Sequence, residues 1–345
     1  MKNIIVHGSY FANNFGDTIL VQETIKLIKE ISPEAQILRA RKGHEQEALE
    51  FNNKIWSGEV PSALIYTGGG YLGENANSMY LKRVFWAFRN YFRHFYWAKE
   101  KNINCKVVFL CVGYGPISVG WFKRLVIRRL NKAELIVFRD NESYRLYRLD
   151  GGSNKNAYVL NDLILLRYCV NRSVPQKQSG VLGVHLNSFA VERLKLIVSA
   201  LKQNDAVDRV VFFCDANTKH IKKYKAICES LFSPDEATFE AYAGPDNLFK
   251  TLQKLEYVIT AKLHIGIVSI SFGLKVLSIA HHSKTTRLYK QIGREDWCID
   301  RKQVNFSDIN NGIDKLMSSK DASMNVSELQ ENYRKLHQHL GKALN

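Results

Sequence analysis

Short apolar runs, each followed by a polar or glycine-containing turn and then a helix-like stretch, organise the first half of the chain. The runs cover residues 3–7, 35–40, 63–67, 106–112, 135–138 and 158–161. Nearly continuous apolar strands that alternate with helices are typical of a parallel sheet that is covered on both faces. We therefore predict a doubly wound α/β domain over residues 1–172.

The same rhythm restarts after a polar stretch at residues 171–180, which is typical of a linker. The new apolar runs lie at residues 181–186, 209–214, 257–260, 275–279 and 297–299. They predict a second doubly wound domain over residues 178–320, followed by a closing helix within 321–345. One face of that helix carries Val326, Leu329, Tyr333, Leu336 and Leu340. Two Rossmann-like domains joined by one linker describe a GT-B-like architecture, in which the domains face a cleft and the last helix crosses back.

Length, charge and the start of the chain narrow the class of protein. A chain of 345 residues exceeds the size of a single hydrophobic core, which agrees with two domains. The formal net charge of +16 indicates an anionic partner, which is a nucleic acid, a membrane surface or a phosphorylated substrate. The first residues lack the long apolar segment of a secretory signal, and no stretch is apolar enough to span a membrane, so we expect a cytoplasmic protein.

Glycines follow two of the predicted strands. In open α/β sheets ligands bind outside the carboxyl ends of the strands, so residues at these ends are candidates for a site. Gly68, Gly69 and Gly70 follow one run, and Gly113 and Gly115 follow another. Glycine lets the backbone approach an anion closely, although a tight turn explains the same pattern. Neither stretch contains the dinucleotide-binding pattern GxGxxG.

Polar and charged residues precede two predicted helices. Asp17 comes just before a helix expected from about residue 18, where it caps that helix or, with Asn14, lies near an acceptor hydroxyl. Arg139 follows a strand, and its planar guanidinium suits a carboxylate or phosphate. The alternative for Arg139 is an ion pair with Asp140 or Glu142, and Asp140 is itself a candidate helix cap.

A basic and histidine-containing segment opens an apolar helix in the second half. Lys262 and His264 stand at this helix start, where packing explains a histidine poorly and where anions are favoured. Lys284 follows a later strand and is a candidate phosphate contact. The neighbouring His281 and His282 lack a third ligand at suitable spacing, so we expect no metal site.

An aromatic and basic segment occupies residues 81–101. Its apolar residues at helical spacing are Leu81, Val84, Phe85, Phe88, Phe92 and Phe95. We expect these side chains to face a core and the basic side chains to be solvated. The alternative is that the segment docks on anionic lipid as a basic amphipathic surface. No nucleic-acid-binding motif is visible, so we expect no nucleic acid partner.

Taken together, these motifs resemble the polysaccharide pyruvyl transferase family, in the family's order and over roughly residues 3–293. The matching pieces are Asn14-Phe15-Gly16-Asp17, Gly68-Gly69-Gly70, Gly113-Tyr114-Gly115-Pro116, Phe138-Arg139-Asp140-Asn141-Glu142-Ser143, Asn161-Asp162, Lys262-Leu263-His264 and Ser283-Lys284. The resemblance implies a GT-B fold, phosphoenolpyruvate as donor, a pyruvate ketal on a surface-polysaccharide sugar as product, and no further cofactor. The family often has arginine where Lys262 stands.

Under this hypothesis the donor contacts are Arg139, Lys262, Leu263 and Lys284, and His264 is the general acid. Asp17 orients or deprotonates the acceptor sugar, which an undecaprenyl diphosphate carrier would hold at the inner face of the membrane. Two other functions fit the same sequence. One is a GT-B glycosyltransferase that uses a nucleotide sugar, and the other is a non-catalytic, membrane-associated subunit of a polysaccharide assembly complex.

Overall fold

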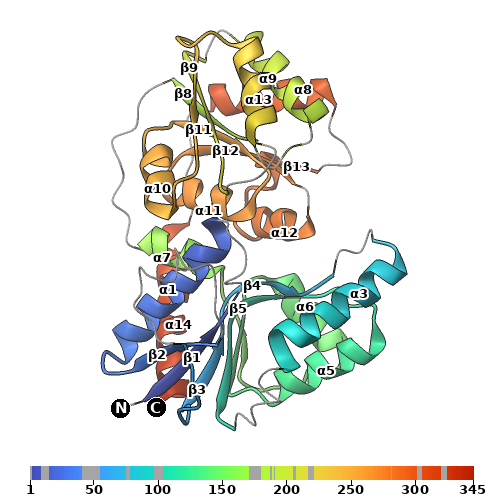
Figure 1. Cartoon of the computed structure of the whole chain (residues 1–345), viewed down its shortest axis with the longest axis vertical. Coiled ribbons are helices and arrows are strands. Elements are labelled where there is room, and N and C mark those ends of the chain that lie inside the picture. The colour runs from blue at the N-terminus through green and yellow to red at the C-terminus, as the bar shows by residue number, and fades with distance from the viewer. Residues whose placement is uncertain are drawn as a thin grey trace. The chain divides into compact units, whose positions relative to one another are not determined.

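Two parallel β-sheets form the centres of two units in the computed structural model of the chain (Figure 1). The structure describes residues 2–8, 15–40, 55–74, 78–96, 104–170, 180–186, 189, 191–204, 207–216, 221–280, 282–300, 305–319 and 325–345. Unit 1 holds the described residues of Met1–Ala12, Asp17–Arg167 and Ser327–Asn345, and unit 2 holds those of Asn13–Gly16 and Tyr168–Val326. The predicted α/β class with two doubly wound sheets is confirmed. Most of the predicted linker, residues 171–179, lies outside the described residues.

The sheet of unit 1 is parallel throughout. Its strands are β1 (Asn3–His7), β2 (Gln36–Arg39), β3 (Ala63–Tyr66), β4 (Gly69–Leu72), β5 (Lys106–Tyr114), β6 (Leu135–Phe138) and β7 (Ala157–Val159). They are ordered β2-β1-β3-β5-β6-β7, and β4 also pairs with β5. The chain leaves β1 first toward β2 and then toward β3, so the topological switch point, where such sheets bind ligands, lies between β1 and β3.

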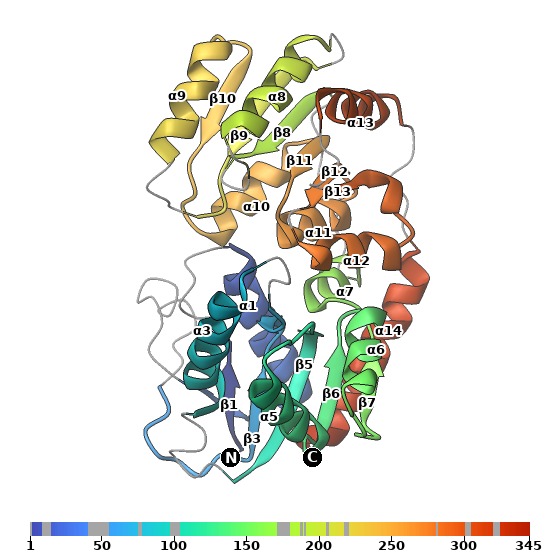
Figure 2. The ribbon, with the colours of Figure 1, turned by 90° about the vertical axis from the view of Figure 1, so that its right-hand side faces the viewer.

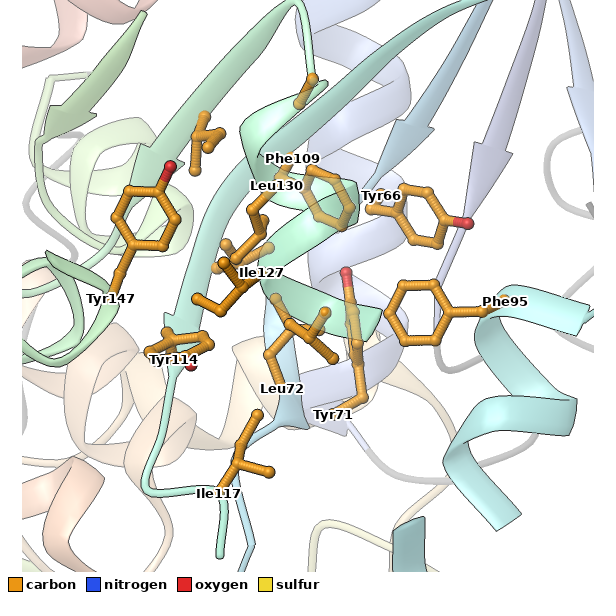
Figure 3. Close-up of a cluster of buried hydrophobic side chains, with 14 of the residues drawn as sticks. Tyr66, Tyr71, Leu72, Phe95, Phe109, Tyr114, Ile117, Ile127, Leu130 and Tyr147 are labelled. Carbon is orange, nitrogen blue, oxygen red and sulfur yellow. The ribbon is translucent and has the colours of Figure 1, made fainter. Parts of the chain in front are cut away.

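Helices cover both faces of this sheet. They are α1 (Phe15–Ile31), α3 (Tyr80–Asn90), the π-helix η1 (Tyr91–Tyr96), α5 (Gly120–Asn131), α6 (Asn141–Leu149), α7 (Leu163–Val170) and α14 (Val326–Leu344). Figure 1 shows α1 and α14 on one face of the sheet and α3 and α5 on the other. The core under α3, α5 and α6 is aromatic. Tyr66 stacks on Phe109 at a centroid distance of 4.6 Å, and Tyr147 packs edge-on to Tyr114 (Figure 3).

The aromatic segment differs from the expectation that its apolar stripe faces a core. Leu81, Phe85, Phe88 and Phe92 are exposed, whereas Phe95 is buried. Small and polar positions explain the difference, because the buried face of α3 carries Ala87 and Asn90 rather than the large side chains. Helical spacing correctly predicted an apolar face, but the prediction that this face is buried in a core was wrong for most of its residues.

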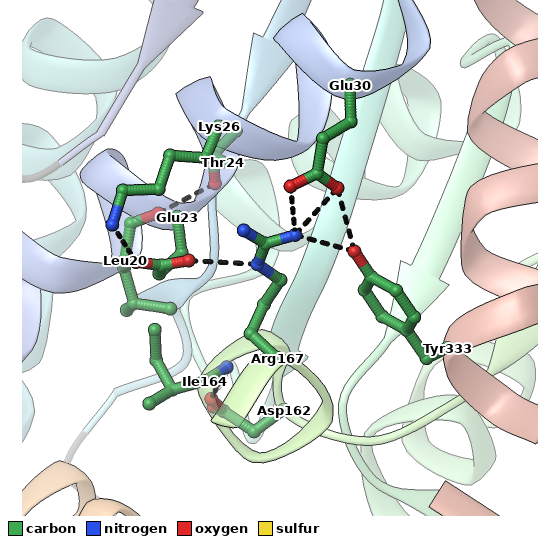
Figure 4. Close-up of polar contacts among 9 residues, drawn as sticks. All are labelled: Leu20, Glu23, Thr24, Lys26, Glu30, Asp162, Ile164, Arg167 and Tyr333. Atoms are coloured by element: carbon green, nitrogen blue, oxygen red, sulfur yellow. Dashed lines mark hydrogen bonds and ion pairs between the residues drawn. The ribbon is translucent and has the colours of Figure 1, made fainter. Parts of the chain in front are cut away.

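A buried arginine joins the closing helix to unit 1 (Figure 4). Arg167 of α7 donates from Nε to Glu23 at 2.9 Å and from Nη1 to Glu30 at 2.6 Å, both on α1. The same Nη1 lies 2.6 Å from the hydroxyl oxygen of Tyr333 on α14. Although burial opposes it, hydrogen bonds from Arg167 and Tyr333 lower the pKa of Glu30 below its ordinary value. The predicted apolar face of α14 is confirmed, since Leu329, Leu336 and Leu340 are buried.

The sheet of unit 2 is also parallel. Its strands are β8 (Val181–His185), β9 (Arg209–Phe213), β10 (Ala237–Glu240), β11 (Tyr257–Thr260), β12 (Lys275–Ala280) and β13 (Cys298–Asp300). The order β10-β9-β8-β11-β12-β13 is that of a dinucleotide-binding Rossmann sheet, with the switch point between β8 and β11. Among the described residues of both units, no helix has the length and apolar content needed to cross a membrane.

Helices surround this second sheet as well. They are α8 (Val191–Lys202), α9 (Ile221–Leu231), α10 (Pro245–Gln253), α11 (Leu263–Ser271), α12 (Ser283–Gln291), the short 3-10 helix η3 (Glu295–Trp297) and α13 (Phe306–Ser318). Helix α13 packs beside α8 (Figure 2). Helix α11 is apolar and almost entirely buried, and it follows β11 directly. The start of α11 is therefore fixed at the carboxyl end of a central strand.

Candidate functional site

Three buried polar side chains meet at the switch point of unit 2. His185 ends β8, Thr260 ends the adjacent β11, and Asp215 follows β9. The Thr260 Oγ1 and His185 Nδ1 atoms are 3.2 Å apart, and His185 Nε2 is 3.3 Å from Asp215 Oδ1. All three residues are at most 2% exposed. A chain of polar groups thus crosses the strand ends where ligands of such sheets bind.

Lys262 extends this chain to the surface. Its ammonium lies 3.5 Å from Asp215 Oδ2, and its side chain is 43% exposed, whereas that of Asp215 is only 3% exposed. The backbone N–H of Lys262 donates to Thr260 Oγ1 at 3.0 Å, which fixes the start of the helix. Because an ammonium has three N–H donors, Lys262 can remain beside Asp215 and still bind an anion.

His264 lies in the first turn of α11, two residues beyond Lys262. Lys262 is the N-cap residue of this helix, and its side chain makes no capping hydrogen bond. The first N–H groups of a helix lack partners within the helix and favour anions. The helix start, the ammonium and the imidazole thus form one cationic, hydrogen-bonding corner of unit 2.

The Phe15-Gly16 pair belongs to this corner although it lies far away in the sequence. Phe15 donates its backbone N–H to the carbonyl oxygen of Asp215 at 2.9 Å, and its ring packs edge-on to Phe249. A Cβ atom at Gly16 would overlap the His264 ring. Glycine is therefore required here for the close approach of the backbone to the imidazole. Two motifs predicted separately, at residues 14–17 and 262–264, meet in the structure.

Arg139 occupies a different environment, in unit 1. It follows β6, is 7% exposed, and lies 3.5 Å from Asp140 Oδ2. Its guanidinium rests on Gly113, where an added Cβ would come within 2.5–2.8 Å of the guanidinium atoms. Within the part of the chain that the structure describes, the guanidinium makes this ion pair and no hydrogen bond. A buried guanidinium with so few partners has donors left for an anion.

The predicted helix cap at Asp140 is confirmed. Its Oδ1 accepts a hydrogen bond from the backbone N–H of Ser143 at 2.7 Å, at the start of α6. The Ser143 hydroxyl in turn accepts from the Tyr114 N–H at 2.9 Å, which ties α6 to the end of β5. The aspartate therefore has a structural task as well as its ion pair with Arg139.

The glycine stretch after β3 enters a further strand and is not the tight turn that was the alternative to a ligand role. Gly69 and Gly70 begin β4, which pairs with β5, and Gly69 has a φ of +152°, which favours glycine. A Cβ at Gly68 would come within 3.1 Å of the Cys111 carbonyl oxygen, whereas Gly70 has open space around it. Gly115 also has a positive φ, of +63°. Packing and backbone conformation within unit 1 therefore account for Gly68, Gly69 and Gly115.

The remaining candidates are placed as follows. Asp17 is not the cap of α1, because the helix begins two residues earlier at Phe15 and already includes Asp17 in its first turn. A carboxylate there is favoured by the helix dipole. Leu263 is buried, and Lys284 is partly buried in the first turn of α12. Asn14 lies outside the described residues, as does His281.

The roles of His185 and Thr260 were missed by sequence reasoning. The only local signal was a polar residue at the end of each apolar strand, and their proximity depends on β8 pairing with both β9 and β11. Within the described ranges, no group of three or more histidine, cysteine, aspartate or glutamate side chains could hold a metal ion.

Comparison with known proteins gives a family and a fold. A search of curated proteins found no match. The UDP-GlcNAc 2-epimerase of Neisseria meningitidis, solved with UDP-GlcNAc bound, superposes with a TM-score of 0.62 at 11% identity, covering 99% of this chain and 100% of that one. The UDP-GlcNAc 2-epimerase of Methanocaldococcus jannaschii gives 0.59 at 12% identity, covering 97% and 99%. MurG of Acinetobacter baumannii gives 0.50 at 13% identity, covering 98% and 95%.

These structural similarities, at such low identity, show a GT-B-type fold alone. The comparison with protein families also identifies a family. The profile of the family described as polysaccharide pyruvyl transferase matches residues 14–283, which is most of the chain and includes both motifs that meet at the start of α11. The chain therefore belongs to the polysaccharide pyruvyl transferase family.

Proposed function

We propose that the protein transfers a pyruvyl group from phosphoenolpyruvate to two hydroxyls of a sugar of a bacterial surface polysaccharide or capsule. A proton adds to the C3 methylene of the donor, and one sugar hydroxyl forms a bond to C2. The bond from C2 to the phosphate oxygen breaks, and a second hydroxyl then closes the ketal. The two hydroxyls release two protons, of which C3 and the departing phosphate each take one.

The observation that carries this proposal is the corner formed by Lys262, His264 and the first turn of α11. Phosphoenolpyruvate bears a phosphate and a carboxylate, and its transfer needs cations, N–H donors and an acid within reach of one small molecule. This corner offers an exposed ammonium 3.5 Å from a buried carboxylate, an imidazole, and a helix start. The net charge of +16 would also speed the capture of a small, highly charged anion.

Each residue of the corner has a distinct role in the proposal. Lys262 binds the anionic donor, and Asp215 holds the ammonium in place. His264 protonates the methylene carbon, because a positioned histidine is the side chain that most often serves as a general acid. Lys284, in the first turn of α12, is a further donor contact.

Two further assigned groups, Arg139 and Asp17, lie in unit 1. Arg139 is the second cation for the anionic donor, on the basis of its unused donors beside Gly113. Asp17 serves the acceptor, together with Asn14. The acceptor is a sugar on an undecaprenyl diphosphate carrier at the cytoplasmic side of the membrane.

The test is a reaction with defined substrates. Purified protein is incubated with phosphoenolpyruvate and a panel of lipid-linked and free sugars, and both phosphate release and the mass of the sugar product are measured. We expect phosphate release that depends on the sugar, together with a product heavier by one ketal-linked pyruvate. Turnover of UDP-GlcNAc or another nucleotide sugar, with no use of phosphoenolpyruvate, would instead assign the site to a glycosyltransferase. Two of the structural comparisons, the UDP-GlcNAc 2-epimerases, make that nucleotide sugar the first alternative to include.

A further inference from the structure

An exposed apolar stripe runs along α3 and η1 in unit 1. Leu81, Phe85, Phe88 and Phe92 are 74%, 70%, 49% and 51% exposed. Their spacing of four, three and four residues places all four on one side of a helix. Large aromatic side chains gathered on a surface in this way mark a place where another surface binds.

Basic side chains run parallel to this stripe. Lys82, Arg89 and Arg93 are each one residue beyond a member of the stripe, so they share a neighbouring line along the helix, and all three are exposed. We call the stripe and this line together the aromatic-basic face. Neither residues 78–96 nor residues 120–131 contain an aspartate or glutamate. These two helical segments therefore contribute apolar and cationic groups to the face and no acid of their own.

Helix α5 supports the aromatic-basic face and extends its charge. Phe88 packs against Trp121 at a centroid distance of 5.0 Å, and Trp86 packs edge-on to Phe122 at 5.4 Å. Arg124 and Arg128 of α5 are exposed. Phe88 of the stripe is thus held by a side chain of α5, and the adjoining Trp86 packs on the fully buried Phe122.

Most of these cations are available to a partner. Within the described residues, the ion pairs in these helices join Arg83 to Glu74 and Lys123 to Asp150. Four exposed cations form no ion pair in the same part of the chain: Lys82, Arg89, Arg124 and Arg128. A partner that offers both negative charge and an apolar layer would satisfy this face.

We propose that the aromatic-basic face binds the surface of a bilayer that contains anionic phospholipid. The aromatic side chains would enter the boundary between headgroups and acyl chains, and the cations would lie at the lipid phosphates. Pairing with a second copy through the same face is disfavoured, because it would bring two cationic surfaces together. The inference does not depend on the proposed reaction, since it concerns the surface of unit 1 and is tested without substrate.

The test is flotation of the full-length protein with vesicles. Vesicles of pure phosphatidylcholine are compared with vesicles in which a quarter of the lipid is phosphatidylglycerol, at low and high salt. We expect binding to the anionic vesicles, weakened by salt, and little binding to the neutral ones. The triple variant Lys82→Gln, Arg89→Gln, Arg93→Gln should bind about 100-fold more weakly. The triple variant Leu81→Ser, Phe85→Ser, Phe92→Ser should bind the anionic vesicles at least about tenfold more weakly.

Two matched controls test whether vesicle binding depends on the aromatic-basic face itself or on the overall number of exposed basic and apolar side chains. The first removes three exposed lysines of unit 2, by Lys195→Gln, Lys222→Gln and Lys254→Gln. The second removes three exposed apolar side chains elsewhere, by Val60→Ser, Leu149→Ser and Leu231→Ser. Both controls should bind vesicles like the wild type.

Three outcomes would overturn the proposal. The wild type stays with the aqueous phase in the presence of anionic vesicles, or the lysine control loses as much binding as the triple variant of the face. The third is a stable dimer in sedimentation that the Leu81→Ser, Phe85→Ser, Phe92→Ser variant abolishes, which would assign the face to a second copy.

Discussion

The switch points of the two sheets have a buried histidine each, yet their surroundings differ. In unit 1, His7 ends β1, and its Nε2 lies 2.9 Å from Nδ1 of His94. The aromatic rings of Tyr66 and Tyr71 pack against this pair. In unit 2, His185 contacts Asp215, and Asp215 contacts a half-exposed lysine.

These surroundings separate a histidine that serves packing from one that belongs to the candidate site. Both histidines are fully buried at topologically equivalent positions. The one in unit 1 is enclosed by another imidazole and aromatic rings, so its hydrogen bonds serve packing. The one in unit 2 belongs to a polar chain that ends on Lys262, so it can influence the group that we propose binds the donor. We therefore expect substitutions at the unit 2 switch point to change the reaction, and those at the unit 1 switch point to change stability.

The largest expected effect is at His264. Replacement by alanine should reduce the rate of pyruvyl transfer by at least about 100-fold, the usual contribution of a positioned acid. The fold should be retained, since the change removes atoms next to Gly16 rather than adding them. The readout is phosphate release under saturating donor, with unfolding followed in parallel. His339→Ala, which removes a histidine stacked on Tyr158 in unit 1, is the control and should leave the rate unchanged.

The opposite behaviour is expected at His7. His7→Ala removes the hydrogen bond to His94 and leaves a cavity, which should lower the free energy of unfolding by about 2 kcal/mol. The rate per folded molecule should remain that of the wild type. Chemical denaturation and turnover at a temperature where the variant is folded check both parts. A lost rate with unchanged stability would place His7 in the reaction and break the comparison.

A pair of glycines sharpens the assignment of Arg139. Gly113→Ala introduces a Cβ against the guanidinium, and overpacking of this kind should cost about 1 kcal/mol of stability. Gly70→Ala meets open space, so its stability should be nearly that of the wild type. Thermal unfolding of both variants decides the matter. An equal loss of stability in the two variants would mean that the close contact between Gly113 and the Arg139 guanidinium does not limit stability.

The smallest effect concerns Glu30 and pH. Its pKa is lowered in the folded state, so its stabilising contribution is present above the ordinary value of 4.5 and is lost as the pH falls through the folded-state pKa. The melting temperature of Glu30→Gln should therefore be below that of the wild type at neutral pH, and the difference should shrink under acid conditions. Glu34→Gln, at an exposed position near the end of α1, serves as the control. A difference that does not change with pH would remove the electrostatic explanation.

Strands were read from the sequence more successfully than contacts. Residues 135–138 and 257–260 were predicted with the bounds of β6 and β11, because buried parallel strands are continuous apolar runs. Strand β4 was missed, since Gly69 and Gly70 are typical of a turn, and β10 was missed because it is only half-buried. Helix periodicity showed an apolar stripe at Leu81 and Phe85, but it holds no information on whether a core or solvent faces the stripe.

The candidate site was predictable in parts. The position of Lys262 and His264 at a helix start followed from local pattern and was confirmed. The approach of Gly16 to His264 and the link from His185 to Asp215 join distant segments, and only the order of the strands brings them together. Such contacts depend on the whole fold rather than on any local run of residues.

The most direct test of the central claim is a calorimetric titration with phosphoenolpyruvate. The wild type should bind it, and Lys262→Ala should bind it about 10- to 100-fold more weakly, the range expected for loss of a hydrogen bond to a charged group. Arg139→Ala should also weaken binding, whereas Lys250→Ala, an exposed lysine of α10 in the same unit as Lys262, should not. If the wild type binds UDP-GlcNAc and not phosphoenolpyruvate, or if Lys262→Ala binds phosphoenolpyruvate as tightly as the wild type, the donor site is not the corner at the start of α11.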